Sequence, residues 1–184
     1  MICWFVNLGR IEAVLKSRKG FTVIELVVVI VVLGVLAVIA APRFLNLSSD
    51  AQIASLHGLG GSVKEANQMV YSQAVIEGQE KLSAGSVTFN GTDVETQWGY
   101  ITPTYDNIVK VINFSSEQLD SYTDIPQEDW GVAQRLTKTG QGILYFTPRG
   151  TENIHPDTST YCFFHYSLTS TLSEPQYYYS TRGC

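Results

Sequence analysis

The sequence predicts an α+β fold in which one long N-terminal helix packs on an antiparallel β-sheet of about four strands. Residues 26–41 are all apolar or Gly, which predicts that the first half of the helix spans a membrane. Beyond them, apolar residues recur every three or four positions up to residue 70, which predicts an amphipathic second half. Short segments rich in aromatic and β-branched residues within 79–184 predict the sheet.

The apolar run has the length of a membrane span. Counted from Phe21 it is 21 residues long, and only Thr22 and Glu25 interrupt it. At about 1.5 Å per residue it reaches roughly 30 Å, the thickness of the hydrocarbon core of a bilayer. A secretory signal is the rival interpretation, but the run is long for one, and Pro42 would directly follow a cut behind Ala41.

Charges before and inside the run bear on its orientation and its role. Four basic residues precede it, namely Arg10, Lys16, Arg18 and Lys19. Because such residues keep their end of a helix in the cytoplasm, we expect the remainder of the chain to face outward. A carboxylate as deep as that of Glu25 costs about 2–3 kcal/mol or more if it is unpaired. Either the helix is an ordinary anchor that tolerates this Glu, or Glu25 meets a positive charge inside an assembly.

The string Lys19-Gly20-Phe21-Thr22-Val23-Ile24-Glu25-Leu26, followed by an unbroken apolar helix, resembles the prepilin signature of type IV pilins and related pseudopilins. The resemblance implies that prepilin peptidase cuts between Gly20 and Phe21 and that Phe21, the new N-terminus, is N-methylated. It implies that Glu25 pairs with the N-terminal amine of a neighbouring subunit during filament assembly. It also implies the type IV pilin fold, with Pro42 at the position that kinks the helix.

This resemblance divides the chain into four parts. We expect a leader peptide at 1–20, a transmembrane and filament-core helix at 21–41, its amphipathic continuation at 42–78 and a globular β-rich head at 79–184.

The pairing of Phe21 with Glu25 also has a physical reason, which is charge neutralisation between adjacent helices. Cleavage creates a cationic α-amine at the end of an apolar helix, and a carboxylate four residues along an adjacent helix neutralises it. Each charge is costly when it is left alone in such surroundings. The pair would therefore set the axial register, and assembly would wait for cleavage.

Net charge argues against a role in binding nucleic acid. The whole chain has 12 basic and 17 acidic residues, and the leader holds four of the former and one of the latter, Glu12. The mature chain then keeps 8 basic and 16 acidic residues, a net charge of −8. Phosphate binding needs clustered Lys and Arg, and no such cluster follows Lys19.

The three cysteines divide between leader and head. Cys3 leaves with the leader, whereas Cys162 and Cys184 remain as an even pair in a compartment that permits oxidation. A disulfide between them would close a loop of 23 residues, both ends included. The chain-entropy model gives such a crosslink about 3 kcal/mol of stability.

The second half of the helix carries one apolar stripe, made of Leu56, Leu59, Val63, Ala66 and Val70. We expect this stripe to pack on the head. Gly58, Gly60 and Gly61 weaken the helix and permit close packing or a bend. Gly78 is the expected C-terminal cap.

The head is expected to contain one hairpin, one short helix and three further strands. Asn90-Gly91 is a hairpin turn between strands at 87–89 and 94–96. Residues 104–120 predict a short helix and then a helical turn opened by Ser115-Ser-Glu-Gln, and 124–130 predicts a loop. The remaining strands are expected at 142–147, 161–168 and 176–181, with the cysteine pair bridging neighbouring strands.

A finer resemblance is to type IVa pilins of the mannose-sensitive haemagglutinin (MSHA) kind. It is carried by Ala41-Pro-Arg-Phe-Leu-Asn-Leu47, Gly99-Tyr100, the Cys162-to-Tyr166 strand and the terminal Gly-Cys. This implies a pilus subunit for adhesion, biofilm formation or motility. A type II secretion pseudopilin, a minor pilin and a membrane-anchored periplasmic enzyme or binding module stay open as alternatives.

Candidate catalytic and metal-binding residues are sparse, so we expect no enzyme activity, no cofactor and no metal site. His57, His155 and His165 have no partner at the spacing of a metal site, and no nucleophile motif occurs. The acidic residues of 120–129 predict a solvated loop, since no EF-hand pattern supports calcium. Tyr177-Tyr178-Tyr179 predicts a strand with alternate rings on the core.

The resemblance also implies partners and a location. The expected partners are further copies of the chain in a helical homopolymer, prepilin peptidase/N-methyltransferase, the inner-membrane pilus assembly machinery and, before assembly, the membrane. We expect a single-pass inner-membrane precursor with a cytoplasmic N-terminus and a periplasmic head, and then an extracellular pilus.

Overall fold

The computed structural model describes residues 20–121, 124–136, 142–151, 161–168 and 174–184, without the side chains of 42–46. Contacts divide the chain into two compact units, Met1–Arg43 and Phe44–Cys184, which are described separately. One helix, α1 (Val23–Glu77), belongs to both units and includes 55 residues. The predicted long N-terminal helix is therefore present.

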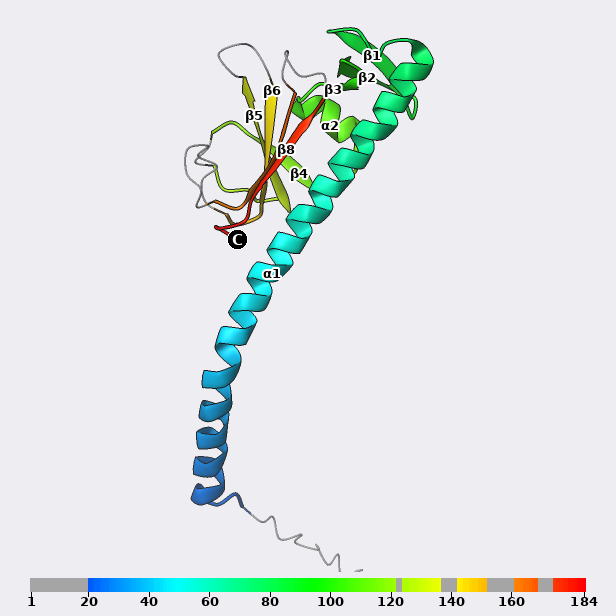
Figure 1. The fold of residues 1–184 in the computed structure, drawn as a ribbon. Helices are drawn as coiled ribbons and strands as arrows, with labels where there is room; N and C mark the ends of the chain where they lie inside the picture. The colour runs from blue at the N-terminus through cyan, green and yellow to red at the C-terminus, as the bar shows by residue number, and fades with distance from the viewer. Residues whose placement is uncertain (1–19, 122–123, 137–141, 152–160, 169–173) are drawn as a thin grey trace, which may run out of the picture. The chain divides into compact units, whose positions relative to one another are not determined.

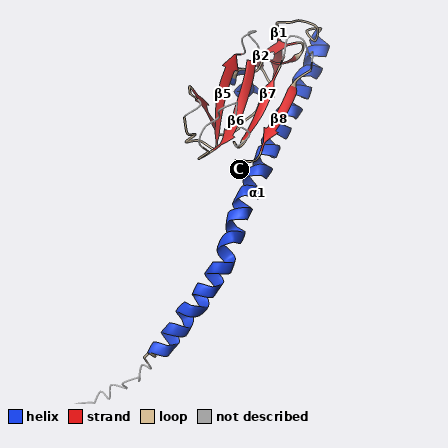
Figure 2. Cartoon of the chain, turned by 60° about the vertical axis from the view of Figure 1, so that its left-hand side comes forward, coloured by secondary structure: helices blue, strands red, loops and turns tan. Residues whose placement is uncertain are grey.

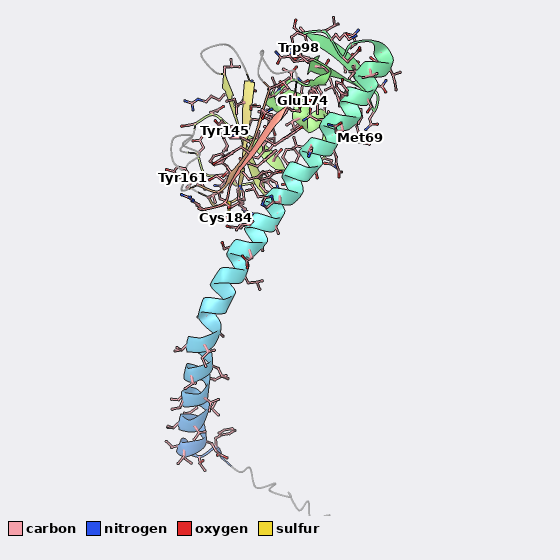
Figure 3. All side chains as sticks on the ribbon, viewed as in Figure 1. Met69, Trp98, Tyr145, Tyr161, Glu174 and Cys184 are labelled. Atoms are coloured by element: carbon pink, nitrogen blue, oxygen red, sulfur yellow. A yellow bond between two sulfur atoms is a disulfide. The ribbon has the colours of Figure 1, made fainter. Side chains whose placement is uncertain are left out.

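In the first unit, α1 supplies a segment that is suited to a membrane. Val23–Ala41 has a mean hydropathy of 3.2 over 19 residues, which is long and apolar enough to cross a bilayer. Its side chains project on all sides of the helix and are not buried by the chain itself (Figure 3). This agrees with an apolar helix whose partners lie outside the molecule.

In the second unit, α1 packs its predicted stripe on the head. All five stripe residues are buried, while Ser55, His57 and Lys64 on the other side are exposed. The helix ends in a Schellman motif around Gly78, which has a φ of 68°. The Gln79 N–H donates to the Ala74 carbonyl at 2.7 Å, as this motif requires. Both the stripe and the cap are thus confirmed.

A three-stranded antiparallel sheet lies at the C-terminal end of α1 (Figure 1). Its strands are β1 (Gly85–Phe89), β2 (Thr92–Gln97) and β3 (Tyr100–Ile101), in the order β1-β2-β3. The predicted turn joins β1 and β2, with φ of 49° at Asn90 and 78° at Gly91. The short helix that follows, α2 (Tyr105–Val111), is capped by the Thr104 side chain.

The larger sheet has five strands in sequence order (Figure 2). They are β4 (Ser116–Leu119), β5 (Trp130–Leu136), β6 (Gly142–Pro148), β7 (Phe163–Ser167) and β8 (Gln176–Ser180). All neighbours pair antiparallel except β4 and β5, which are parallel. The α+β class is confirmed, but the head has two sheets, and the larger one has five strands rather than about four.

The helical turn predicted from Ser115-Ser-Glu-Gln is wrong, because residues 116–119 form β4. A capping box opened by Ser115 would need the Gln118 side chain to turn back to the Ser115 N–H. Here the segment is extended instead, and the neighbouring Glu117 accepts hydrogen bonds from the backbone N–H groups of Gln127 and Glu128. These bonds fix the chain just before β5, and the parallel pairing of β4 with β5 replaces the helical turn.

The core lies between α1 and one face of the larger sheet. Val132, Phe146, Phe164 and Tyr179 stand opposite one another on β5 to β8 and form a row on that face. Gly60 allows the helix to approach this row, since a Cβ at this position would lie 2.2 Å from the Tyr179 hydroxyl oxygen. The expected close packing at the glycines is confirmed for Gly60.

A buried polar cluster joins the helix to both sheets. Asn67 is fully buried, and its Oδ1 accepts from the Ile101 N–H at 3.0 Å and from the Tyr166 hydroxyl at 3.2 Å. The same hydroxyl lies against the Ile101 carbonyl. Since buried polar groups are costly without partners, these bonds favour one arrangement of α1, β3 and β7.

Candidate assembly site

The site that the sequence predicts lies at the start of α1. Thr22 is the N-cap residue, and its side-chain oxygen accepts from the Glu25 N–H at 3.3 Å. The Glu25 carboxylate in turn accepts from the Thr22 N–H at 2.8 Å and from the Thr22 hydroxyl at 2.7 Å. This reciprocal pair is a capping box. Sequence reasoning missed it, although Thr-x-x-Glu before an apolar run is its signature.

The capping box gives Glu25 a local partner before any neighbour arrives. Both accepted hydrogen bonds end on Oε2, so Oε1 has no protein partner among the residues that the structure describes. A carboxylate at a helix N-terminus is also favoured by the helix dipole. The local geometry therefore holds the carboxylate in place and leaves one of its oxygens open to a cation.

The predicted cleavage point lies outside the helix. Gly20 and Phe21 precede the first helical residue, Val23, and have no regular secondary structure. Both are exposed, and the Phe21 side chain has 84 % of its surface accessible. Because a peptidase needs an extended and accessible backbone, the Gly20–Phe21 bond has the surroundings that cleavage requires.

Pro42 lies within the bounds of α1, which continues to Glu77. The division of the chain at Arg43 leaves the two parts of the helix to be described separately, so the kink at Pro42 stays a prediction. Cys3 and the basic residues of the leader lie outside the described residues.

The predicted disulfide is present at the far end of the sequence. Cys162, just before β7, is bonded to Cys184, with their Cα atoms 4.7 Å apart. Figure 3 places Cys184 at the end of the head where β8 also finishes. The bond fixes the last residue of the chain to the core, where Cys162 is buried.

The described histidines, which are candidates for catalysis or metal binding, pack against tyrosine rings. His165 is half-buried between the rings of Tyr145 and Tyr178, with centroids at 5.5 and 5.2 Å, and burial lowers the pKa of this histidine. His57 is exposed on α1 and lies against Tyr179, at 4.5 Å between centroids. His155 is outside the described residues.

The tyrosine triplet and the acidic segment also follow their structural interpretation. Tyr177 and Tyr179 pack on the core, whereas Tyr178 points outward and is 51 % exposed. In the acidic segment, the Glu128 carboxylate accepts from the Ser115 hydroxyl at 2.7 Å. Across the described ranges no three His, Cys, Asp or Glu residues gather where they would hold a metal ion.

Comparisons with known proteins agree with the geometry at the start of α1. Residues 15–41 match the family model described as the prokaryotic N-terminal methylation motif. The type IV narrow pilus major component of Thermus thermophilus is 43 % identical over 56 residues, which is 30 % of this chain and 48 % of that protein. The fimbrial protein EcpC of Eikenella corrodens is 35 % identical over 82 residues, 44 % of this chain and 54 % of that one.

A longer match extends into the head. The type IV major pilin protein of Neisseria gonorrhoeae is 28 % identical over 132 residues, 67 % of this chain and 79 % of that protein. The chain spans only about half the length of the first two relatives. No solved structure matches at a comparable level. The chain is thus similar to type IV pilins and fimbrial proteins, and its residues 15–41 match the N-terminal methylation motif.

Proposed function

We propose that this chain is a structural subunit of a type IV pilus and polymerises through its N-terminal helix into a surface filament. The observation that carries this proposal is the start of α1. There a carboxylate, Glu25, is held by Thr22 at the head of a helix whose apolar side chains have no partners within the chain. An apolar helix with that surface needs either lipid or other helices around it.

The mechanism is assembly without catalysis. Prepilin peptidase cuts the Gly20–Phe21 bond, and the freed amine at Phe21 is N-methylated and keeps its positive charge. The amine of one subunit then meets the open Oε1 of Glu25 in its neighbour. Bundled apolar helices exclude water, so the attraction is stronger than at a surface and an unmatched charge is costly. This pairing sets the axial register of the helices.

The proposed partners and location follow from this mechanism. Before assembly the chain is a single-pass inner-membrane protein with a cytoplasmic N-terminus and a periplasmic head. It is processed by prepilin peptidase/N-methyltransferase and passed to the inner-membrane assembly machinery, and it ends in an extracellular pilus. Adhesion, biofilm formation or motility is the proposed use of the filament, and the MSHA-like subtype stays a prediction.

Substitution of Glu25 by Gln tests the proposal. The variant keeps the size and one acceptor oxygen of the side chain but has no charge to offer the Phe21 amine. We expect normal amounts of cleaved, membrane-held subunit and at least about tenfold less sheared filament, since one unmatched buried charge exceeds about 1.4 kcal/mol. Thr22→Val is the matched control, because it removes the two hydrogen bonds of the Thr22 hydroxyl and keeps the charge of Glu25. Normal filaments from Glu25→Gln would contradict the proposal.

A further inference from the structure

The C-terminal end of α1 and the residues just beyond it carry side chains that do not belong to the core of the head. We name Ile76, Glu77, Lys81 and Leu82 the helix-end patch. Ile76 is 78 % exposed, Leu82 is 44 % exposed, and the Lys81 side chain is 88 % exposed. Glu77 is exposed as well. Two exposed aliphatic side chains beside opposite charges give this end of the head a surface on which a partner could pack.

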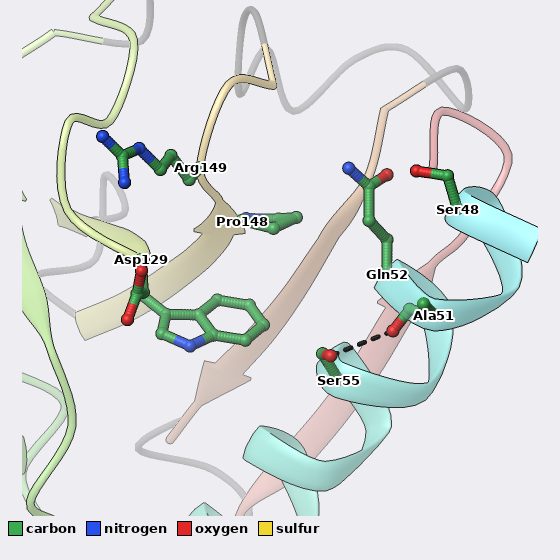
Figure 4. A pocket seen from close by; sticks show the side chains of 8 residues that line it. Ser48, Ala51, Gln52, Ser55, Asp129, Pro148 and Arg149 are labelled. Atoms are coloured by element: carbon green, nitrogen blue, oxygen red, sulfur yellow. Dashed lines mark hydrogen bonds between the residues drawn. The ribbon is translucent and has the colours of Figure 1, made fainter. Parts of the chain in front are cut away.

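At the other end of the head there is an open pocket of about 460 Å³ between α1 and the larger sheet (Figure 4). Pro148 lies on its sheet side and Gln52 lies opposite on α1. Trp130, the first residue of β5, also lines this pocket, which we name the Trp130 pocket. Asp129 and Arg149 stand at its rim, where the Arg149 N–H donates to the Asp129 carbonyl at 3.0 Å. Neither charged side chain has an ion-pair partner within the described part of the chain.

The two surfaces are complementary in charge and polarity. The helix-end patch offers the Glu77 carboxylate, which accepts from the Gln73 amide at 2.6 Å, and the Lys81 ammonium, which lies 3.8 Å from the Glu80 carboxylate. Two aliphatic side chains lie beside these exposed charges. The pocket offers one guanidinium and one carboxylate beside an indole and a proline ring. Each charge of the patch therefore has an opposite partner at the rim of the pocket, in an arrangement that favours one orientation.

One chain is unable to make this contact with itself, because the same helix holds the two surfaces apart. Gln52 beside the pocket and Glu77 in the patch are separated by 25 residues of α1. At about 1.5 Å per residue this is about 38 Å. A contact between the patch and the pocket therefore joins two copies.

We infer that the helix-end patch of one copy docks in the Trp130 pocket of the next, with Glu77 meeting Arg149 and Lys81 meeting Asp129. This inference rests on the proposed function, in which the helices run parallel. The contact is heterologous, so repetition along the helix axis continues without closing, as a filament requires. It predicts an axial offset of about 38 Å between the two copies in contact.

Docking between two copies of the chain uses both the helix-end patch and the Trp130 pocket. A small ligand or a different protein in the pocket uses only one of these surfaces. A small ligand in the pocket leaves the exposed Ile76 and Leu82 without a role. A different protein bound in the pocket would need its own carboxylate and ammonium, which the helix-end patch already supplies. The two surfaces therefore favour self-association over either of these occupants.

Charge reversal in cells that assemble the filament tests the inference. Glu77→Arg and Arg149→Glu are each expected to lower the recovery of sheared filaments about tenfold, and the double variant should restore it. Asp120→Arg, at an exposed acidic residue outside both surfaces, is the matched control and should leave recovery unchanged. Protease resistance of the membrane-held subunit checks that each head is folded.

The outcomes distinguish failure of the proposed function from failure of the docking inference alone. Absence of the unaltered chain from filaments would contradict the proposed function itself. Filaments from both single variants in normal amounts would overturn only the docking inference. A double variant with no better filament recovery than either single variant would overturn it too. A loss of filaments confined to Arg149→Glu would also overturn it, because it would indicate a different occupant of the pocket.

Crosslinking gives an independent readout. Glu77→Cys combined with Arg149→Cys is expected to produce a ladder of disulfide-linked subunits in oxidised filaments. Asp120→Cys combined with Arg149→Cys should give monomers. A filament of the first variant that remains monomeric after oxidation would overturn the inference.

Discussion

His165 is the described histidine with the most buried ring, and it stands in a row of rings on the side of the sheet away from α1. Tyr145, His165 and Tyr178 are direct partners across β6, β7 and β8. Burial disfavours the charged imidazolium, so the pKa of His165 lies below its usual value of 6.5. Burial thus favours the neutral form of His165 in its place between the two tyrosine rings.

This shift predicts how the stability of the head depends on pH. Below about pH 6.5 the unfolded chain binds a proton at His165 more readily than the folded chain does, so the free energy of unfolding falls as the pH falls towards the lowered pKa of the folded state. We expect a lower melting temperature at pH 5.5 than at pH 7.5, and a smaller difference for His165→Phe. Thermal unfolding of the two proteins measures this. An unchanged difference in the variant would contradict the assignment to His165.

Glu25 illustrates what sequence and structure each provide for a single residue. The prepilin-like string predicted its role, because a lone carboxylate in an apolar run demands a partner. The structure adds the partner within the chain, Thr22, and shows that both of its hydrogen bonds end on Oε2 of the carboxylate. The contact to the neighbour's amine lies between chains, so it stays part of the proposed function.

At the scale of elements, the glycines of α1 differ in their surroundings. A Cβ at Gly60 would collide with the Tyr179 ring, whereas a Cβ at Gly61 would meet nothing within 4 Å. Tyr179 is itself held against Phe164, at 4.9 Å between ring centroids. Two neighbouring glycines thus serve different ends, since one allows the sheet to approach and the other only weakens the helix.

Alanine at the two positions should therefore shift stability in opposite directions. Gly61→Ala is expected to raise the free energy of unfolding by about 0.5–1 kcal/mol, the difference in helix propensity. Gly60→Ala is expected to lower it by about 1–3 kcal/mol, because Tyr179 has to move within a packed core. Thermal or denaturant unfolding of the two variants in parallel provides the comparison. Stabilisation by both substitutions would show that the Tyr179 contact is unimportant.

The elements that sequence reasoning found are those with strong local signals. The stripe from Leu56 to Val70 and the Asn90-Gly91 turn are set by periodicity and backbone preference within a few residues. β4 and β5 have no such signal. β4 exists because Glu117 binds the backbone at residues 127 and 128 and because its strand pairs with one that lies beyond a loop. Contacts of that kind depend on the whole fold.

At the scale of the molecule, the two units have different tasks. The first unit presents an apolar helix whose side chains the chain leaves exposed. The second has its own core, a disulfide and two sheets. In the proposed filament the first unit supplies the polymer interface, and the second unit adds the inferred contact between the helix-end patch and the Trp130 pocket.

Mass spectrometry of filaments sheared from the cell surface shows whether the processed chain is the material of the filament. We expect a dominant chain that begins at methylated Phe21 and has a mass two hydrogens below the reduced value, because Cys162 and Cys184 are joined. A filament made of another protein, with this chain confined to the membrane or still carrying residues 1–20, would contradict it.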